Sequence, residues 1–190
     1  MIPLGILAAA GGAVAAAGSY DLLATEILTS SQSSVTFASL GSYSANYEHL
    51  QLRVSARQQT PGALATVAFR VQFNSDTTAG NYANHGLFGN GSSVTSYAAT
   101  NNNQIGSITT QNATSDSYSA TVIDLLDAFS SSKYTTARSL SGAAGTNPDV
   151  VLRSVLWKST SSITSITLDG YGDNLLAKSR FSLYGIRKAA

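Results

Sequence analysis

The sequence predicts an all-β protein, an antiparallel β-sandwich or jelly roll that carries an extended apolar N-terminal arm. Three observations lead to this prediction. Apolar and polar residues alternate with a period of two in many segments after residue 20, as in half-buried strands. Connectors rich in Gly, Ser and Asn separate these segments, as expected for turns. Ser and Thr make up about a quarter of the chain, and residues 1–20 carry no charge.

The composition limits the classes of protein to which the chain can belong. Its 190 residues suffice for one domain that buries a core without disulfides or metals. Only 11% of the residues are charged and the formal net charge is +1, so the sequence lacks the clustered basic residues of a nucleic-acid-binding surface. The absence of cysteine excludes disulfides, zinc-thiolate sites and thiol nucleophiles. This composition favours a scaffolding protein over an enzyme.

We expect residues 1–19 to be an assembly arm and residues 20–190 to be a single β-sandwich domain. The arm is uncharged, since the first acidic residue is Asp21 and the first basic residue is Arg53. A signal peptide needs a positively charged start, which the arm lacks. A membrane span needs about 20 strongly apolar residues, whereas the arm is mostly Ala and Gly. Docking into another protein therefore explains the arm best, and its bulky residues are Ile2, Pro3, Leu4, Ile6 and Leu7.

The first strands of the domain are expected at Asp21–Thr29 and Ser34–Phe37, where β-branched and aromatic residues are frequent. The clearest alternation follows in residues 50–57 and again in residues 67–73. Between them, Gln59–Gly62 contains a Pro-Gly pair that is typical of a turn. These two segments are therefore predicted to form an antiparallel hairpin.

Residues 74–103 form the longest stretch without a recognisable strand pattern, and they are rich in Asn, Gly and Ser. A connection of this length usually has a function of its own. We expect it to form a loop that contacts a ligand or receptor, although its aromatic residues would equally serve as core residues beneath the loop. The candidate residues of this loop are Asp76, Tyr82, His85, Phe88 and Tyr97.

The remaining strands are expected after this loop, again separated by turn-forming residues such as those of 142–148. No segment after residue 20 sustains the helical period, and no internal repeat is present. The five predicted strands are Ser117–Leu126, Tyr134–Ser141, Val150–Lys158, Ile163–Leu168 and Arg180–Ile186.

Side chains suited to catalysis or metal binding are few. A Ser-His-Asp triad is not expected at His85, because no Gly-x-Ser-x-Gly motif is present, and a hydrogen bond within its loop is the simpler role. His49 is expected to pack on Tyr47 at the start of a strand. The loop Asp169–Asn174 is rich in oxygen ligands but lacks the EF-hand pattern, so a cation site and ordinary Asx turns both stay open. No catalytic residue, metal or cofactor is therefore expected.

Several short motifs occur in a particular order along the chain. In this order they resemble a group of small bacteriophage structural proteins that is common in marine and cyanobacterial phages. The likeness covers about Tyr20–Arg187 and includes an Ala-rich leader. The motifs are SVTF at 34–37, YEHLQLR at 47–53, FNSD at 73–76, NYANH at 81–85, GNGSS at 89–93, LWKST at 156–160, ITSIT at 163–167 and FSLYGI at 181–186.

The resemblance implies a component of the virion and carries no catalytic residue across. The charge-free arm, joined to a self-contained β-sandwich, favours an accessory subunit whose arm anchors it to the tail, as a fibre or appendage, while the β-sandwich projects outward. The alternative is a decoration or cement protein on the capsid. Its expected partners are other virion proteins of tail or capsid and further copies of the chain, with a trimer favoured, and neither nucleic acid nor a membrane is expected.

Two other functional classes stay open. A carbohydrate-binding module would recognise a host surface glycan through the loop at 74–103. A secreted hydrolase with a cleaved signal would use His85, and it is the least favoured of the three.

Overall fold

The computed structural model describes residues 20–60, 63–143 and 148–188. The predicted arm, with Ile2, Pro3, Leu4, Ile6 and Leu7, lies outside these residues. The described part confirms the all-β prediction, with two short 3-10 helices, η1 (Leu40–Tyr43) and η2 (Ala79–Asn81). None of its helices has the length and apolar character needed to cross a membrane. Its strands are β1 (Tyr20–Ile27), β2 (Ser34–Phe37), β3 (Tyr47–Gln58), β4 (Thr66–Phe73), β5 (Tyr82–Gly89), β6 (Val94–Thr100), β7 (Gln104–Thr110), β8 (Ser119–Leu125), β9 (Thr135–Ala143), β10 (Asp149–Trp157), β11 (Ile166–Gly170) and β12 (Arg180–Arg187).

The twelve strands of the described residues form one open, mostly antiparallel sheet. Their order is β2-β11-β4-β7-β3-β8-β9-β10-β5-β6, and β12 joins β1 to β3. The central strand β3 pairs antiparallel with β12 and β8 over most of its length. At its C-terminal end it pairs in parallel with β7, through Arg57 and Gln58 opposite Thr109 and Thr110.

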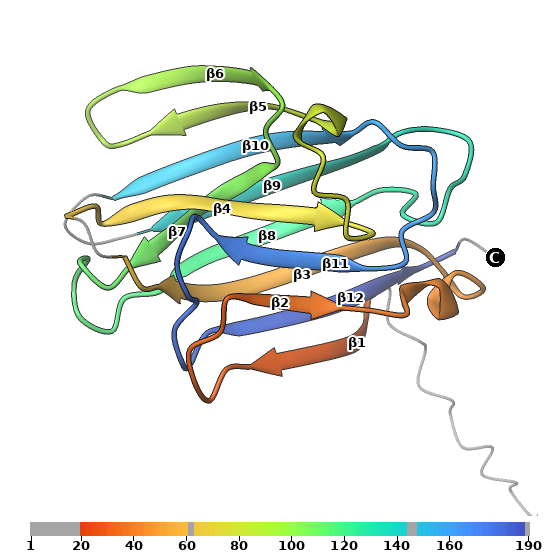
Figure 1. Cartoon of the computed structure of the whole chain (residues 1–190), viewed down its shortest axis with the longest axis horizontal. Coiled ribbons are helices and arrows are strands. Elements are labelled where there is room, and N and C mark those ends of the chain that lie inside the picture. Colours follow the sequence, from red (N-terminus) through yellow and green to blue (C-terminus); the bar gives the residue numbers. More distant parts are fainter. Residues whose placement is uncertain (1–19, 61–62, 144–147, 189–190) are drawn as a thin grey trace, which may run out of the picture.

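This short parallel pairing is the point at which the sheet changes direction. Strand β7 packs against β8, β9 and β10 although it shares no ladder with them. Figure 1 shows β2, β11, β4 and β7 lying in front of the longer run of strands, with the β5–β6 hairpin at one end and β1 at the other. The apolar core is shared by both parts. Its largest fully buried side chains include Phe69, Phe73, Tyr82, Leu50, Leu52, Ile108, Ile123, Leu125 and Phe181.

Each of the nine predicted strand segments overlaps a strand of the structure. The alternation in residues 50–57 corresponds to β3, where Leu50, Leu52 and Ala56 are fully buried. Strands β9 and β10 alternate strictly between buried and exposed residues along most of their length. A sheet with one face on the core imposes this period of two, so the sequence records it directly.

The predicted hairpin between residues 50–57 and 67–73 is wrong. The structure places β4 between β11 and β7, whereas β3 lies between β12 and β8. Both strands direct their apolar faces into the same core, but they do so from different parts of the sheet. Alternation identifies the buried face of a strand and carries no information on its neighbour. Of the predicted turn, Pro61 and Gly62 lie outside the described residues.

The prediction of a long irregular loop at residues 74–103 is also wrong. This stretch holds the antiparallel hairpin of β5 and β6, and the next strand, β7, was not predicted either. Strand β6 has no buried residue, so it shows no alternation. Strand β7 is buried on both faces, and its buried residues mix Ile105 and Ile108 with Ser107, Thr109 and Thr110, so apolar and polar residues do not alternate along it. The hydrophobic pattern therefore fails at these strands for a physical reason.

The junction of β1, β3 and β12 depends on a glycine. A Cβ atom at Gly185 would lie 2.5 Å from Cδ1 of Tyr47, because the tyrosine ring covers this position of β12. The Tyr47 hydroxyl donates a hydrogen bond of 3.0 Å to Oδ2 of Asp21, and Arg187 reaches the same oxygen at 2.8 Å. The ring thus fastens the edge strand β1 to the sheet, and only glycine leaves room for it.

We predict that Gly185→Ala lowers the free energy of unfolding by about 1–3 kcal/mol, because the added methyl group displaces the Tyr47 ring and its hydrogen bond to Asp21. Urea unfolding followed by circular dichroism measures this change. Gly41→Ala is the matched control, since a Cβ at Gly41 meets no atom within 4 Å. Equal midpoints for the two variants would contradict this role of the glycine.

Candidate functional site

One face of the sheet exposes a set of aliphatic side chains in lateral register. Val122, Leu140, Leu152 and Leu87 stand opposite one another across β8, β9, β10 and β5. Each of these four side chains is at least 40% exposed. Val150 and Val94 extend this surface, since they stand on either side of Gly89 across β10, β5 and β6. We call this surface the aliphatic patch; its members are Leu87, Val94, Val122, Leu140, Val150 and Leu152.

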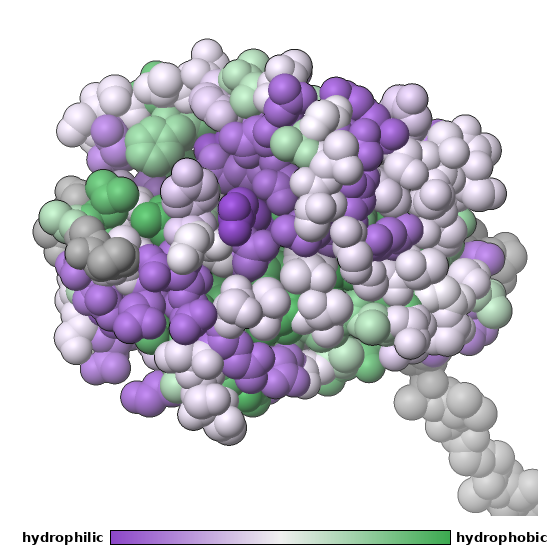
Figure 2. Space-filling view, in the orientation of Figure 1, coloured by the Kyte–Doolittle hydropathy of each residue, from purple (hydrophilic) through white to green (hydrophobic). Residues whose placement is uncertain are grey.

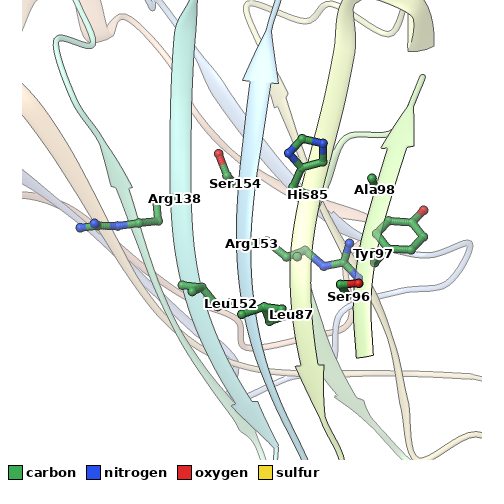
Figure 3. Close-up of a pocket in the computed structure, with 10 residues that line it drawn as sticks. His85, Leu87, Ser96, Tyr97, Ala98, Arg138, Leu152, Arg153 and Ser154 are labelled. Atoms are coloured by element: carbon green, nitrogen blue, oxygen red, sulfur yellow. The ribbon is translucent and has the colours of Figure 1, made fainter. Parts of the chain in front are cut away.

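A shallow depression of about 490 Å³ adjoins the aliphatic patch. Residues of β5, β6, β9 and β10 line it, and Figure 3 shows His85, Leu87, Leu152 and Arg138 around it. His85 stands between Ser154 of β10 and Ala98 of β6. The depression therefore has an apolar floor with polar groups along one side.

Tyr97 is held in place by Arg153. The Arg153 guanidinium lies 4.9 Å from the centre of the Tyr97 ring, as Figure 3 illustrates, and it is almost fully buried. Burial lowers the pKa of Arg153, and the neighbouring Tyr97 and Asp149 oppose this change. The contact ties β10 to β6 across Gly86, where a Cβ atom would come within 3.1 Å of the Arg153 side chain.

A second, polar groove lies over β4 and β11. Figure 2 shows a band of hydrophilic residues across this part of the molecule. Arg70 donates from Nε to Oδ1 of Asp169 at 2.5 Å, and its guanidinium lies 5.5 Å from the ring centre of Tyr171. Burial raises the pKa of Asp169, and the Arg70 hydrogen bond and charge act in the opposite direction. Two adjoining hollows of about 310 and 360 Å³ share Arg70 and Gln72.

Asp76 connects the turn before β5 to the core. Its Oδ2 accepts hydrogen bonds from Nε1 of Trp157 and Nδ2 of Asn81, both at 2.8 Å, and its Oδ1 accepts from the Thr78 N–H. Partial burial raises the pKa of Asp76, but the bonds from Trp157, Asn81 and Thr78 outweigh it and lower the pKa to about 2. The Tyr82 hydroxyl donates to the Asp76 carbonyl at 3.0 Å. This arrangement makes Asp76 a structural carboxylate.

Glu48, His49 and Asp127 bring their side chains together at the start of β3. The Nδ1 atom of His49 accepts a hydrogen bond of 2.8 Å from the Asp127 N–H. The Asp127 carboxylate pairs with Lys133, whose hydrogen bond lowers the pKa of Asp127 despite partial burial. Nδ1 of His49 and the Asp127 carboxylate therefore already have partners within the protein. The cluster connects β3 to the turn after β8 through hydrogen bonds.

The structure divides the predicted receptor residues into separate groups. Asp76 and Tyr82 lie together beside the core, and Tyr82 is only 1% exposed, with its pKa raised to about 12 by burial. His85 and Tyr97 both line the depression beside the aliphatic patch. Phe88 is half-buried on β5, opposite Val151 and Thr95. The five residues therefore do not form one loop surface.

Sequence reasoning did not single out Arg153, Trp157 or Tyr171. Trp157 ends a strand that was predicted correctly, but its partner Asp76 is 81 residues away in the sequence. Arg153 occupies a buried position in an alternating strand, where an apolar residue is usual. A charged residue on the buried face of β10 was the one local sign in the sequence that this position has a special contact.

Comparisons with known proteins add no assignment. The chain matches no protein-family model, no curated protein and no solved structure. The resemblance to phage structural proteins thus stays a prediction.

We predict that Asp76→Asn lowers the free energy of unfolding by about 1–3 kcal/mol near neutral pH, since one amide oxygen cannot replace a carboxylate that accepts three hydrogen bonds. The folded-state pKa of about 2 lies below the ordinary 3.8. The ionised carboxylate therefore stabilises the fold fully above about pH 4, and this contribution is lost as the pH falls toward 2.

Urea unfolding of the wild type and the variant at several pH values measures this difference, which should shrink between about pH 4 and pH 2. Asp116→Asn is the control, because the Asp116 side chain is 82% exposed. A difference between wild type and Asp76→Asn that stays constant down to pH 2 would show that the Asp76 charge does not stabilise the fold.

Proposed function

We propose that the chain is a non-enzymatic structural subunit of a bacteriophage virion. In this proposal residues 1–19 anchor it to the particle, and the β-sheet body projects from the attachment point as part of a tail fibre or appendage. The observation that carries the proposal is the aliphatic patch, which provides a broad apolar surface for packing against a neighbouring virion protein.

The size and shape of the aliphatic patch favour a protein partner. Its six members belong to five consecutive strands of the sheet, so they form one surface instead of scattered apolar residues. Contiguous exposed patches of this kind mark interaction sites in soluble proteins, since their burial removes apolar area from water. The ion pair between Arg138 and Asp124, 3.3 Å apart, adjoins the patch and supplies the polar edge that interfaces commonly have.

We also propose that the β-sheet body is a two-layered β-sandwich. The packing of β7 against β8, β9 and β10 supports this description, because the core then lies between two parts of the sheet. The first described residue, Tyr20, begins the edge strand β1, and Arg53 and Tyr47 secure this end of the sheet through Tyr20 and Asp21. An arm that precedes Tyr20 would therefore pull on a strand that is fastened to the body.

We predict that deletion of residues 2–19 abolishes incorporation of the chain into particles, while the β-sheet body still folds. The double variant Leu140→Ser, Leu152→Ser should reduce incorporation at least ten-fold, because it removes two central members of the aliphatic patch. Tagged chains are supplied during infection by the virus that encodes the protein, and an immunoblot of purified particles measures incorporation.

Leu64→Ser is the control for the patch, since Leu64 is 62% exposed outside it. Circular dichroism verifies that each variant is folded. Absence of the full chain from purified particles, or incorporation of the deletion variant at the full-chain level, would overturn the proposal.

A second candidate function, recognition of a saccharide, is favoured by the polar groove over β4 and β11. Tyr171 is 65% exposed and offers a ring on which the C–H face of a sugar packs. Gln72 and Asn101 supply amide groups suited to hydroxyls. The charge of Arg70 is compensated by Asp169, so the groove suits a neutral saccharide better than an acidic one.

We predict that Tyr171→Ala weakens binding to neutral oligosaccharides at least ten-fold, because the stacking surface is lost. An array of neutral glucans, galactans and mannans measures binding. Tyr134→Ala, which removes a tyrosine of 53% exposure outside the groove, is the matched control. Equal binding by both variants, or no binding by the wild type to any of these glycans, would remove saccharide recognition at this groove.

A further inference from the structure

The described sheet has three terminal strands, and two of them are protected against pairing with another chain. Strand β1 carries Asp21 and Glu26, and its register shifts between Leu22 and Ala24. Strand β2 has only four residues. Charges, irregularities and shortness are the usual means by which proteins block their sheet edges.

Strand β6 lacks all three forms of protection. Its seven residues, VTSYAAT, contain no charge and no proline, and its register with β5 is uninterrupted. Every residue of β6 is at least partly exposed. Val, Thr and Tyr favour extended backbone, so the edge is both accessible and preformed.

The hydrogen bonds at the two ends of the β5–β6 hairpin identify which backbone groups of β6 point outward. The Asn101 N–H donates to the Tyr82 carbonyl at 2.8 Å, and the Asn90 N–H donates to the Ser93 carbonyl. In an antiparallel ladder the bonded pairs recur at every second residue. Residues 95, 97 and 99 therefore bond to β5, and the N–H and C=O groups of Val94, Ser96, Ala98 and Thr100 point away from it.

We propose that β6 pairs antiparallel with β6 of a second copy of the chain, around a two-fold axis at Tyr97. In this register Ser96 stands opposite Ala98 of the second copy, and Val94 stands opposite Thr100. All four outward-pointing residues of each copy then form hydrogen-bonded pairs, which no register displaced along the strand achieves. The partner is a second copy because the same edge satisfies itself, as an isologous two-fold interface requires.

The charge and the side chains of β6 suit this arrangement. Two copies that approach through β6 bring no charged residue of this strand together, and the whole chain carries a formal charge of only +1. Val94, a member of the aliphatic patch, stands beside Thr100 of the second copy, so pairing covers part of this exposed valine. On the opposite face, the Tyr97 rings of the two copies meet at the axis, each beneath its own Arg153.

This inference concerns the isolated chain and does not depend on the virion assignment. It predicts a dimer, where the sequence favours a trimer. Sedimentation velocity of the full chain up to ~100 µM should give the mass of a dimer. Ser96→Pro deletes one outward-pointing N–H and no bond to β5, so it should raise the dimer dissociation constant at least ten-fold while the fold is retained.

Cysteine cross-linking tests the register, since the chain has no cysteine of its own. Tyr97→Cys places two thiols at a non-hydrogen-bonded antiparallel pair, where Cα atoms are about 4.5 Å apart and a disulfide forms readily. A mixture of Thr95→Cys and Ala99→Cys chains should also cross-link, and it leaves the contact of Tyr97 with Arg153 intact. The control is Thr36→Cys, at an exposed position of the other terminal strand β2.

The expected result is a covalent dimer for the β6 variants and none for Thr36→Cys on a non-reducing gel. A monomeric or trimeric full chain would overturn the proposal, as would equal cross-linking of the control. Leu140→Ser with Leu152→Ser should leave the dimer intact, so failure of this inference and failure of the proposed virion contact are distinguishable.

Discussion

The fold depends on how β3 ends. At Arg57 and Gln58 this strand, already paired on both sides with β12 and β8, takes β7 as a parallel neighbour. The Arg57 side chain reinforces the join. Its Nε donates to the Thr110 carbonyl at 3.1 Å, and its Nη2 donates to the carbonyls of Gln111 and Ala113. These carbonyls offset the cost of burying the Arg57 charge, and together they fix where the side chain lies at this corner of the sheet.

The exposed surfaces of the sheet follow from this corner. Because β7 turns over β8, β9 and β10, the near face of these strands becomes core and their far face stays open as the aliphatic patch. The polar groove lies over β4 and β11, on the outer side of the part of the sheet formed by β2, β11, β4 and β7. The hairpin of β5 and β6 extends the sheet to an unprotected edge. The two proposed contacts, apolar packing and strand pairing, thus arise from one topology.

Sequence reasoning located the strands in which buried and exposed residues alternate clearly. Strands β9 and β10 illustrate this success, since their alternation is almost unbroken. It failed at β6, which has no buried residue, and at β7, whose core-facing residues include Thr and Ser. It grouped Asp76 and Tyr82 in one loop with His85, Phe88 and Tyr97, whereas the structure places these two beside the core. Their roles depend on Trp157 and Phe73, and the contact with Trp157 spans 81 residues of sequence.

The amino-acid sequence by itself determined the all-β class, most strand positions and the near-neutral charge, because each of these is a local or additive property. Only the tertiary structure decided which strands are neighbours, since pairing depends on how distant apolar faces close a common core. It alone separated His85 and Tyr97 from Asp76 and Tyr82. It also revealed that β6 ends the sheet with unpaired backbone groups, a property that the strand acquires from its place in the sheet and not from its residues alone.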